Sequence, residues 1–203
     1  MGRRPSLDNV DKFHDSNSYL PTRTIFMGSE ESSIEFATES GVDAAMSQRV
    51  IKNLHVMESI SKEPITIILN NFGGDVNHGL AIYDAIKSCQ SKVIIKVYGG
   101  AMSMGSIILQ AGDERLMAPQ ASQMIHYGQL GLNKEALTVY KIIDEMKRVD
   151  RWMEQLYLEK IHEKHPKFSL GRLRNMLKHD TFLTAEQSVE LGLADAVIEY
   201  PSS

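Results

Sequence analysis

Hydrophobic side chains are arranged in two kinds of pattern along the first two thirds of the chain. Residues 65–69 and 92–98 are runs rich in β-branched side chains, which are typical of strands buried on both faces of a parallel sheet. Residues 42–60 and 80–86 instead repeat apolar positions at roughly helical spacing. Shorter β-rich stretches at 22–28 and 122–125 predict two more strands, and we expect regular structure to begin at Thr22.

Glycine pairs separate these predicted strands from the helices that follow them. Gly73-Gly74 ends the first buried strand, and Gly99-Gly100 ends the second, before an apolar helix at 102–111. A strand, a glycine turn and a helix, repeated in that order, predict an α/β fold with parallel strands and crossover helices. Residues 170–178 predict a later helix, and a final strand follows Asp195.

Residues 134–164 form the longest periodic segment. Its apolar side chains recur at intervals of three to five residues over about 30 positions, which is long for a helix of a globular protein. Such a helix can lie entirely on the core of its own chain, or it can reach a neighbouring subunit. We favour an arm that takes part in an oligomer.

The length of 203 residues suits one domain, which we place at residues 19–200. Residues 1–18 are largely polar, so we expect a flexible N-terminal segment there. Neither a signal-peptide hydrophobic region nor an apolar run of about 18 residues is present. We therefore expect no membrane association and a cytoplasmic location.

Charge and composition exclude several classes of partner and binding site. A formal net charge of -4 is not typical of a nucleic-acid-binding protein, so we expect no such partner. The single cysteine, Cys89, excludes an internal disulfide and most cysteine-based zinc sites. His162 and His165 stand one residue too close for the zinc-binding spacing H-E-x-x-H. We expect neither a metal nor a cofactor.

The turn at residues 70–76 is the first candidate for binding chemistry. Its two glycines would let backbone N–H groups face outward, where they could hold an oxyanion or a phosphate. The turn matches neither the Walker A loop nor the G-x-G-x-x-G fingerprint, so nucleotide binding has little support. A purely structural turn is the alternative.

Ser103 is the candidate nucleophile. It lies where the second glycine turn, residues 99–105, leads into a helix, and this is similar to the nucleophile elbow G-x-S-x-G except that Ala101 replaces the first glycine. Serine is also a preferred N-cap residue, so the pattern alone allows a helix cap as readily as a nucleophile.

A serine nucleophile needs a base and a carboxylate that orients it. His126 follows the β-rich stretch 122–125 and would stand at a strand end, facing a cleft. Four aspartates compete for the third role, and spacing does not choose among them. They are Asp75, Asp113, Asp180 and Asp195.

Taken together, six short motifs between Thr22 and Val197 resemble ClpP, the proteolytic subunit of the Clp protease. The turn at 70–74 is similar to Asn-Ser-Pro-Gly-Gly, the helix at 79–84 to Gly-x-x-Ile-Tyr-Asp, and residues 99–105 to Gly-x-Ala-x-Ser-Met-Gly. Ile125-His126 and the stretch 180–185 match the family's Ile-His and Asp-x-Phe-x-Ser/Thr-Ala patterns, and 191–195 matches its closing turn.

The resemblance implies a ClpP/crotonase-type fold with a protruding handle helix at about 134–164. It implies a serine endopeptidase with the triad Ser103, His126 and Asp180, and an oxyanion hole formed by the N–H groups of Gly74 and Met104. It also implies stacked heptameric rings that enclose a chamber, in which polypeptide substrates are cleaved after an AAA+ unfoldase such as ClpX or ClpA feeds them in.

The chain departs from the family pattern at four places, none of them a triad residue. Phe72 replaces a proline in the first substrate-binding turn. Tyr127-Gly128 replaces Gln-Pro after the histidine, and the loop that enters the handle is shorter. Lys178-His179 replaces an acidic residue and an arginine before Asp180, and residues 1–18 differ from the usual axial segment.

Two other functions remain open for this sequence. One is a phage-type ClpP-like maturation protease that acts without an unfoldase. The other is a crotonase-like acyl-CoA enzyme, in which the glycine turns would hold a thioester oxygen and no covalent serine chemistry would occur. A catalytically silent ring subunit is disfavoured because all three triad residue types are present.

Overall fold

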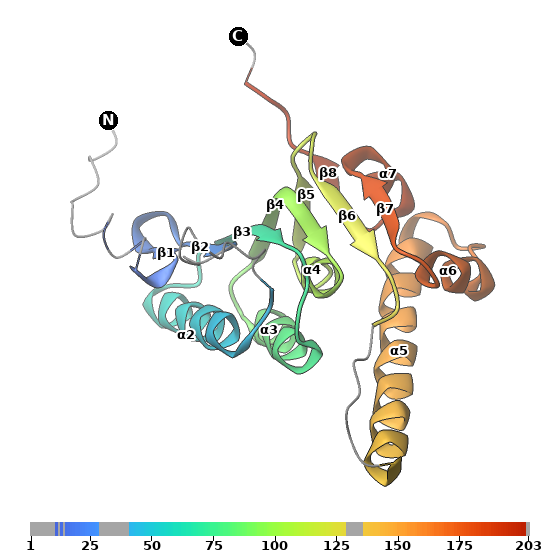
Figure 1. Ribbon diagram of the computed structural model, residues 1–203. Helices are drawn as coiled ribbons and strands as arrows, with labels where there is room; N and C mark the ends of the chain where they lie inside the picture. Colours follow the sequence, from blue (N-terminus) through green and yellow to red (C-terminus); the bar gives the residue numbers. More distant parts are fainter. Residues whose placement is uncertain (1–10, 12, 14, 29–40, 129–135, 202–203) are drawn as a thin grey trace, which may run out of the picture.

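A sheet of eight strands organises the part of the chain that the computed structural model describes, residues 11, 13, 15–28, 41–128 and 136–201 (Figure 1). Its main path runs β1-β2-β3-β4-β5-β8, and β6 pairs with both β4 and β7. The strands are β1 Ser18–Tyr19, β2 Thr24–Met27, β3 Ile65–Asn71, β4 Val93–Met102, β5 Glu114–Met117, β6 Ser122–Ile125, β7 Thr181–Thr184 and β8 Ala196–Val197.

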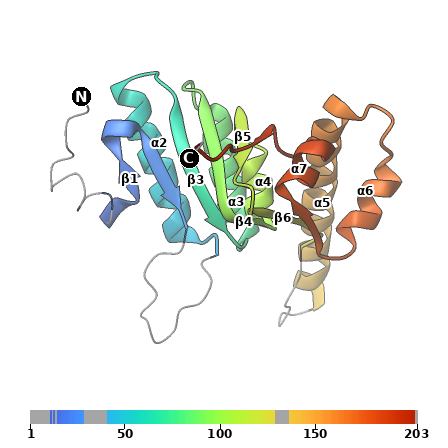
Figure 2. The ribbon, with the colours of Figure 1, turned by 90° about the horizontal axis from the view of Figure 1, so that it is seen from above.

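The helices lie in two groups at opposite ends of this sheet. In Figures 1 and 2, α2, α3 and α4 lie along its first half, whereas α5, α6 and α7 lie together at its far end. The helical elements are the 3₁₀ turn η1 Leu20–Thr22, α2 Ala44–Ile60, α3 Val76–Ser88, α4 Met104–Leu109, α5 Ala136–Lys164, α6 Leu170–Leu177 and α7 Ala185–Leu191.

Parallel pairing dominates the sheet, as the sequence predicts. Only β1–β2 and β6–β7 are antiparallel among the strand pairs of the described residues. Along β3, the fully buried side chains Ile65, Ile67 and Leu69 alternate with half-buried ones and so point to one face. Buried side chains of α2 and α3 belong to the same hydrophobic core. The predicted α/β fold is therefore confirmed.

The predicted turn at Gly99-Gly100 is wrong, because β4 continues through both glycines to Met102. The strand pairs with β5 from Ile94 to Val97 and then with β6 from Gly100 to Met102. The glycines thus mark a change of neighbour within one strand rather than its end. Ser103 follows directly after the end of this strand.

The chain's N-terminal region differs in part from expectation. Regular structure does not begin at Thr22, because Ser18–Tyr19 already pairs with β2, and residues 11, 13, 15 and 16 are helical. Residues 1–10, 12 and 14 of the predicted flexible segment lie outside the described residues.

Helix α5 has two distinct halves. Its C-terminal half packs on the core through Met153, Leu156, Tyr157 and Ile161, which are all buried. None of the described side chains at 139–152 is buried, and Figure 1 shows this half running away from the sheet. The predicted start at Lys134 lies outside the described residues, and the predicted end at Lys164 is confirmed.

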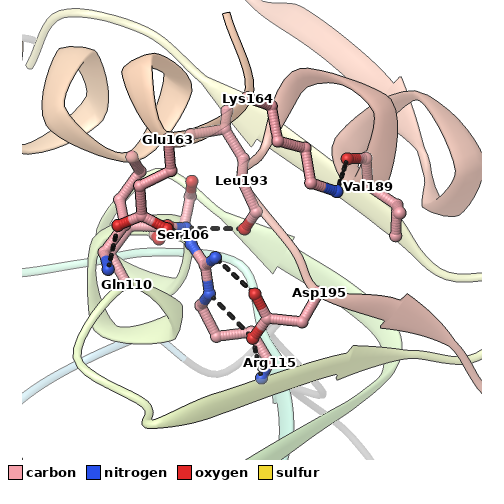
Figure 3. Close-up of polar contacts among 9 residues, drawn as sticks. Ser106, Gln110, Arg115, Glu163, Lys164, Val189, Leu193 and Asp195 are labelled. Atoms are coloured by element: carbon pink, nitrogen blue, oxygen red, sulfur yellow. Dashed lines mark hydrogen bonds and ion pairs between the residues drawn. The ribbon is translucent and has the colours of Figure 1, made fainter.

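A polar network fastens the C-terminal segment to the sheet (Figure 3). The buried guanidinium of Arg115 on β5 forms an ion pair with Asp195, with 2.6 Å between Nη2 and Oδ1. It also donates to Gln110 at the end of α4, and the Gln110 amide donates to the carbonyl of Leu193. These bonds hold the chain between α7 and β8 against β5.

Candidate active site

Ser103 occupies a strained turn between β4 and α4. Its backbone φ is 50° and ψ is -117°, a conformation that non-glycine residues rarely adopt. Its N–H donates to the carbonyl of Met124 on β6, 2.9 Å away, which helps to hold the turn. Ser103 stands at the N-cap position of α4, but its hydroxyl makes no capping bond. The side chain is therefore free of the structural role that the sequence left open.

The hydroxyl of Ser103 instead meets His126, with 2.8 Å between Oγ and Nε2. On the other side of the ring, Nδ1 lies 2.9 Å from Oδ1 of Asp180. A carboxylate only accepts hydrogen bonds, so Nδ1 carries the proton and Nε2 is left to accept the one from Ser103. The three side chains form one continuous line of hydrogen bonds.

The antiparallel pairing of β6 with β7 explains why His126 and Asp180 meet. Ile125 faces Thr181 at the end of this ladder. His126 follows the first of these residues and Asp180 precedes the second, so the two are neighbours beyond the last strand pair. The ring of His126 is 14% exposed, whereas the Asp180 side chain is 52% exposed.

The other three aspartates have different partners. Asp75 caps α3 by accepting from the N–H of His78, and Asp113 accepts from the N–H of Val93. Asp195 pairs with Arg115. Only Asp180 of the four candidates is hydrogen-bonded to the histidine.

Gly73 and Gly74 bring the first glycine turn against the serine. Gly73 has a φ of +105°, and a Cβ added there would lie 2.7 Å from Cβ of Ser103. Gly74 has a φ of +138°, and its added Cβ would lie 2.3 Å from the backbone nitrogen of Val42. Both the backbone conformation and the close approach therefore require glycine.

The N–H of Gly74 is not used by the bridge that this turn makes with Val42. That bridge runs through the carbonyl of Gly73 and the N–H of Asp75. Gly74 and Met104 both line the cavity that contains Ser103. That the N–H groups of these two residues form an oxyanion hole stays a prediction.

A cavity of about 750 Å³ opens between these residues and helix α5. Most of the apolar wall of this cavity consists of side chains from α4 and from the outer half of α5, which we define as residues 139–152. The apolar residues that line the cavity are Val76, Met104, Ile107, Ile142, Met146, Val149 and Met153, and the charged ones are Asp75, Lys141, Glu145 and Asp150. Burial and the nearby charge of Glu154 raise the pKa of Asp150.

The side chain that follows the histidine joins a polar cluster with residues of two helices. The phenol of Tyr127 donates to the Glu154 carboxylate on α5, and Arg174 on α6 forms two hydrogen bonds with the same carboxylate. The sequence singles out Tyr127 only as a departure from a family pattern. Nothing in it points to Glu154 or Arg174, because the three residues are 20 or more positions apart.

The histidines near the end of α5 have structural partners. Nε2 of His162 bonds to the carbonyl of Phe168, and Nε2 of His165 to that of Glu190. Within the described ranges, no group of three or more histidine, cysteine, aspartate or glutamate side chains could hold a metal ion. No helix among these residues has the length and apolar character to cross a membrane.

Comparisons with known proteins give a matching family and a similar fold. Residues 22–201 match the model of a protein family described as Clp protease. The fold is similar to a solved structure of a ClpP1 mutant from Listeria monocytogenes, with a TM-score of 0.74 and 24% sequence identity. This match covers 90% of the present chain and 94% of the other. It confirms the predicted ClpP-type arrangement of strands and helices.

Proposed function

Since the chain belongs to the Clp protease family and is a serine-type endopeptidase, we propose that Ser103, His126 and Asp180 are its catalytic triad. The observation that carries the proposal is the line of two hydrogen bonds, 2.8 Å and 2.9 Å long, that joins these three side chains beside a cavity. Nucleophile, base and orienting acid are thus in contact without any rearrangement.

The reaction begins with attack of the Ser103 oxygen on the carbonyl carbon of a peptide bond. Nε2 of His126 accepts the proton from the hydroxyl, and Asp180 holds the ring in the tautomer that this transfer needs. Asp180 also stabilises the imidazolium that forms. Collapse of the tetrahedral intermediate breaks the C–N bond, and His126 returns the proton to the leaving amine.

The oxyanion of that intermediate would be bound by the N–H groups of Gly74 and Met104, which line the cavity with Ser103. Loss of one such donor costs on the order of a hundredfold in rate. Water activated by His126 then hydrolyses the acyl-enzyme, and Ser103 regains its proton.

Polypeptides are the proposed substrates, cleaved inside a chamber formed by a homo-oligomer of stacked heptameric rings. Family membership supports an assembly, as does the outer half of α5, whose described side chains find no core of their own chain to bury them. An AAA+ unfoldase such as ClpX or ClpA would deliver the substrates, and the cytoplasm is the compartment we expect.

The alternatives differ in what they predict. A phage-type maturation protease would use the same triad without an unfoldase. A crotonase-like acyl-CoA enzyme would show no covalent serine chemistry, and the family match disfavours it.

Hydrolysis of a fluorogenic peptide by the assembled protein tests the proposal. We expect turnover by the native chain and none above background by Ser103→Ala, whose state of assembly is checked by native mass spectrometry. Equal rates for the two proteins would overturn the proposal.

A further inference from the structure

Behind the catalytic histidine, three side chains from three segments form a polar cluster, which we call the Tyr127–Glu154–Arg174 cluster. Tyr127 follows His126, Glu154 lies in the buried half of α5, and Arg174 lies on α6. Arg174 donates from Nε to Oε1 of Glu154 over 2.9 Å and from Nη2 to Oε2 over 2.8 Å. The phenol of Tyr127 donates to Oε1 of the same carboxylate.

The electrostatics of the cluster fix its protonation. Arg174 is the main cause of a lowered pKa of Glu154, since it bonds and neutralises the carboxylate. Burial, together with the bond to Glu154, raises the pKa of Tyr127 to about 12, so its phenol stays protonated and donates. Glu154 is only 6% exposed, and a buried carboxylate is stable only with partners of this kind.

Helix α6, which carries Arg174, connects the cluster to both His126 and Asp180. The N–H of Tyr127 donates to the carbonyl of Leu177, the last residue of α6, over 2.8 Å. The Thr181 hydroxyl donates to the carbonyl of Met176 over 2.7 Å. Asp180 lies between these two attachments, so the end of α6 sets its position as well.

We propose that Glu154 is a positioning residue for catalysis, which holds Tyr127 and α6 so that His126 and Asp180 stay in register. The inference rests on the proposed function of the triad. Glu154 touches no substrate and acts through its neighbours. It makes the buried half of α5 part of the catalytic geometry.

The test compares Glu154→Gln with Tyr127→Phe, Glu163→Gln and the double variant Tyr127→Phe/Glu154→Gln. Glu163 is a matched control, because it also lies on α5 and pairs with Lys160 over 3.0 Å, but at an exposed site away from the triad. The readouts are the rate at which a fluorophosphonate modifies Ser103, and kcat and KM for one peptide substrate.

Displacing a catalytic group by about 1 Å can cost on the order of a hundredfold in rate, so we expect Glu154→Gln to lower kcat by roughly tenfold to a hundredfold at unchanged KM. Tyr127→Phe should also lower kcat, but by a smaller factor. The double variant should lose no more than Glu154→Gln alone, because both changes break one connection. Glu163→Gln should react at the native rate.

Several results would overturn the inference. One is a native modification rate for both Glu154→Gln and Tyr127→Phe. Another is an equal loss in Glu163→Gln, which would show a general effect of charge on α5. A rise in KM at constant kcat would assign Glu154 to substrate binding instead. Absence of modification in the native chain would instead contradict the proposed triad itself.

Discussion

Ser103 combines an unusual backbone with a crowded environment. Its φ of 50° directs the hydroxyl toward His126 rather than toward the N-terminus of α4, and Gly73 packs directly against its side chain. The conformation is held by the hydrogen bond to Met124 and by the end of β4. Strain at this residue is thus tied to the placement of its oxygen.

Gly73→Ala tests this packing. The new methyl group would lie 2.7 Å from Cβ of Ser103 at a φ of +105°, so the turn and the serine must move apart. We expect peptidase activity to fall by at least roughly a hundredfold, as for other displacements of about 1 Å. Peptide hydrolysis measures the loss of activity, and thermal unfolding shows whether the variant is folded. Near-native activity would show that the close contact between Gly73 and Ser103 is not needed.

Asp180→Asn tests the orienting acid. An amide can present its NH₂ to Nδ1 and favour the wrong tautomer of His126, so we expect kcat to fall by roughly 10⁴-fold. Asp113→Asn is the matched control, because that carboxylate accepts from the N–H of Val93 at the start of β4, the opposite end of the strand from Ser103. Equal losses in the two variants would argue against a special role of Asp180.

Spacing in the sequence predicts the site only in part. The pattern allows four aspartates, and resemblance to a family, not spacing, singles out Asp180. The three-dimensional reason is the β6–β7 pairing, which brings together residues 54 positions apart. Asp75 has a local partner, since it caps the helix that follows it, whereas the partners of Asp113 and Asp195 lie 20 and 80 positions away.

At the scale of elements, the strength of each periodic pattern decides what could be predicted. Helices α2 and α5 follow from apolar positions that recur at helical spacing over many residues, and strand β3 follows from a continuous apolar run. Strand β5 begins with the charged pair Glu114-Arg115, and β7 has only two apolar residues between two threonines, so neither stands out as a hydrophobic run. The glycines of β4 read as a turn because no sequence signal marks a strand that changes its neighbour.

The outer half of α5 supplies a wall of the cavity, so substrate selection can be altered there without disturbing the core. We expect Met146→Asp to lower kcat/KM for a peptide with a large apolar side chain beside the scissile bond by roughly tenfold or more, since burying that side chain is worth about 1.5–3 kcal/mol. Modification of Ser103 by a small fluorophosphonate should be unaffected.

Gln155→Asp provides the control for that prediction. It introduces the same carboxylate on the same helix at an exposed position outside the cavity. The measurement compares kcat/KM of the two variants for the same peptide. An equal effect of both would mean that added negative charge, not the cavity wall, is responsible.

At the scale of the whole molecule, the C-terminal segment depends on the Arg115–Asp195 pair. Burial raises the pKa of Asp195, but its bonds to Arg115 outweigh this, and the net pKa is lowered. A folded-state pKa below the unfolded value of about 3.9 stabilises the fold above that pH, and this contribution is lost as the pH falls through the folded value.

Asp195→Asn should therefore lower the Tm near neutral pH, and the difference from the native chain should shrink as the pH falls below about 4. Thermal unfolding followed by circular dichroism between pH 3 and 7 measures this. A difference in Tm that is constant over that range would contradict the assignment.

The proposed function depends above all on Ser103 being an activated nucleophile. Intact mass spectrometry after treatment with a fluorophosphonate tests it most directly, because attack by Oγ displaces fluoride and leaves one stable phosphonyl group. We predict a single adduct on the native chain and none on Ser103→Ala. A folded native protein that gains no adduct, or a Ser103→Ala variant that gains the same one, would contradict the claim.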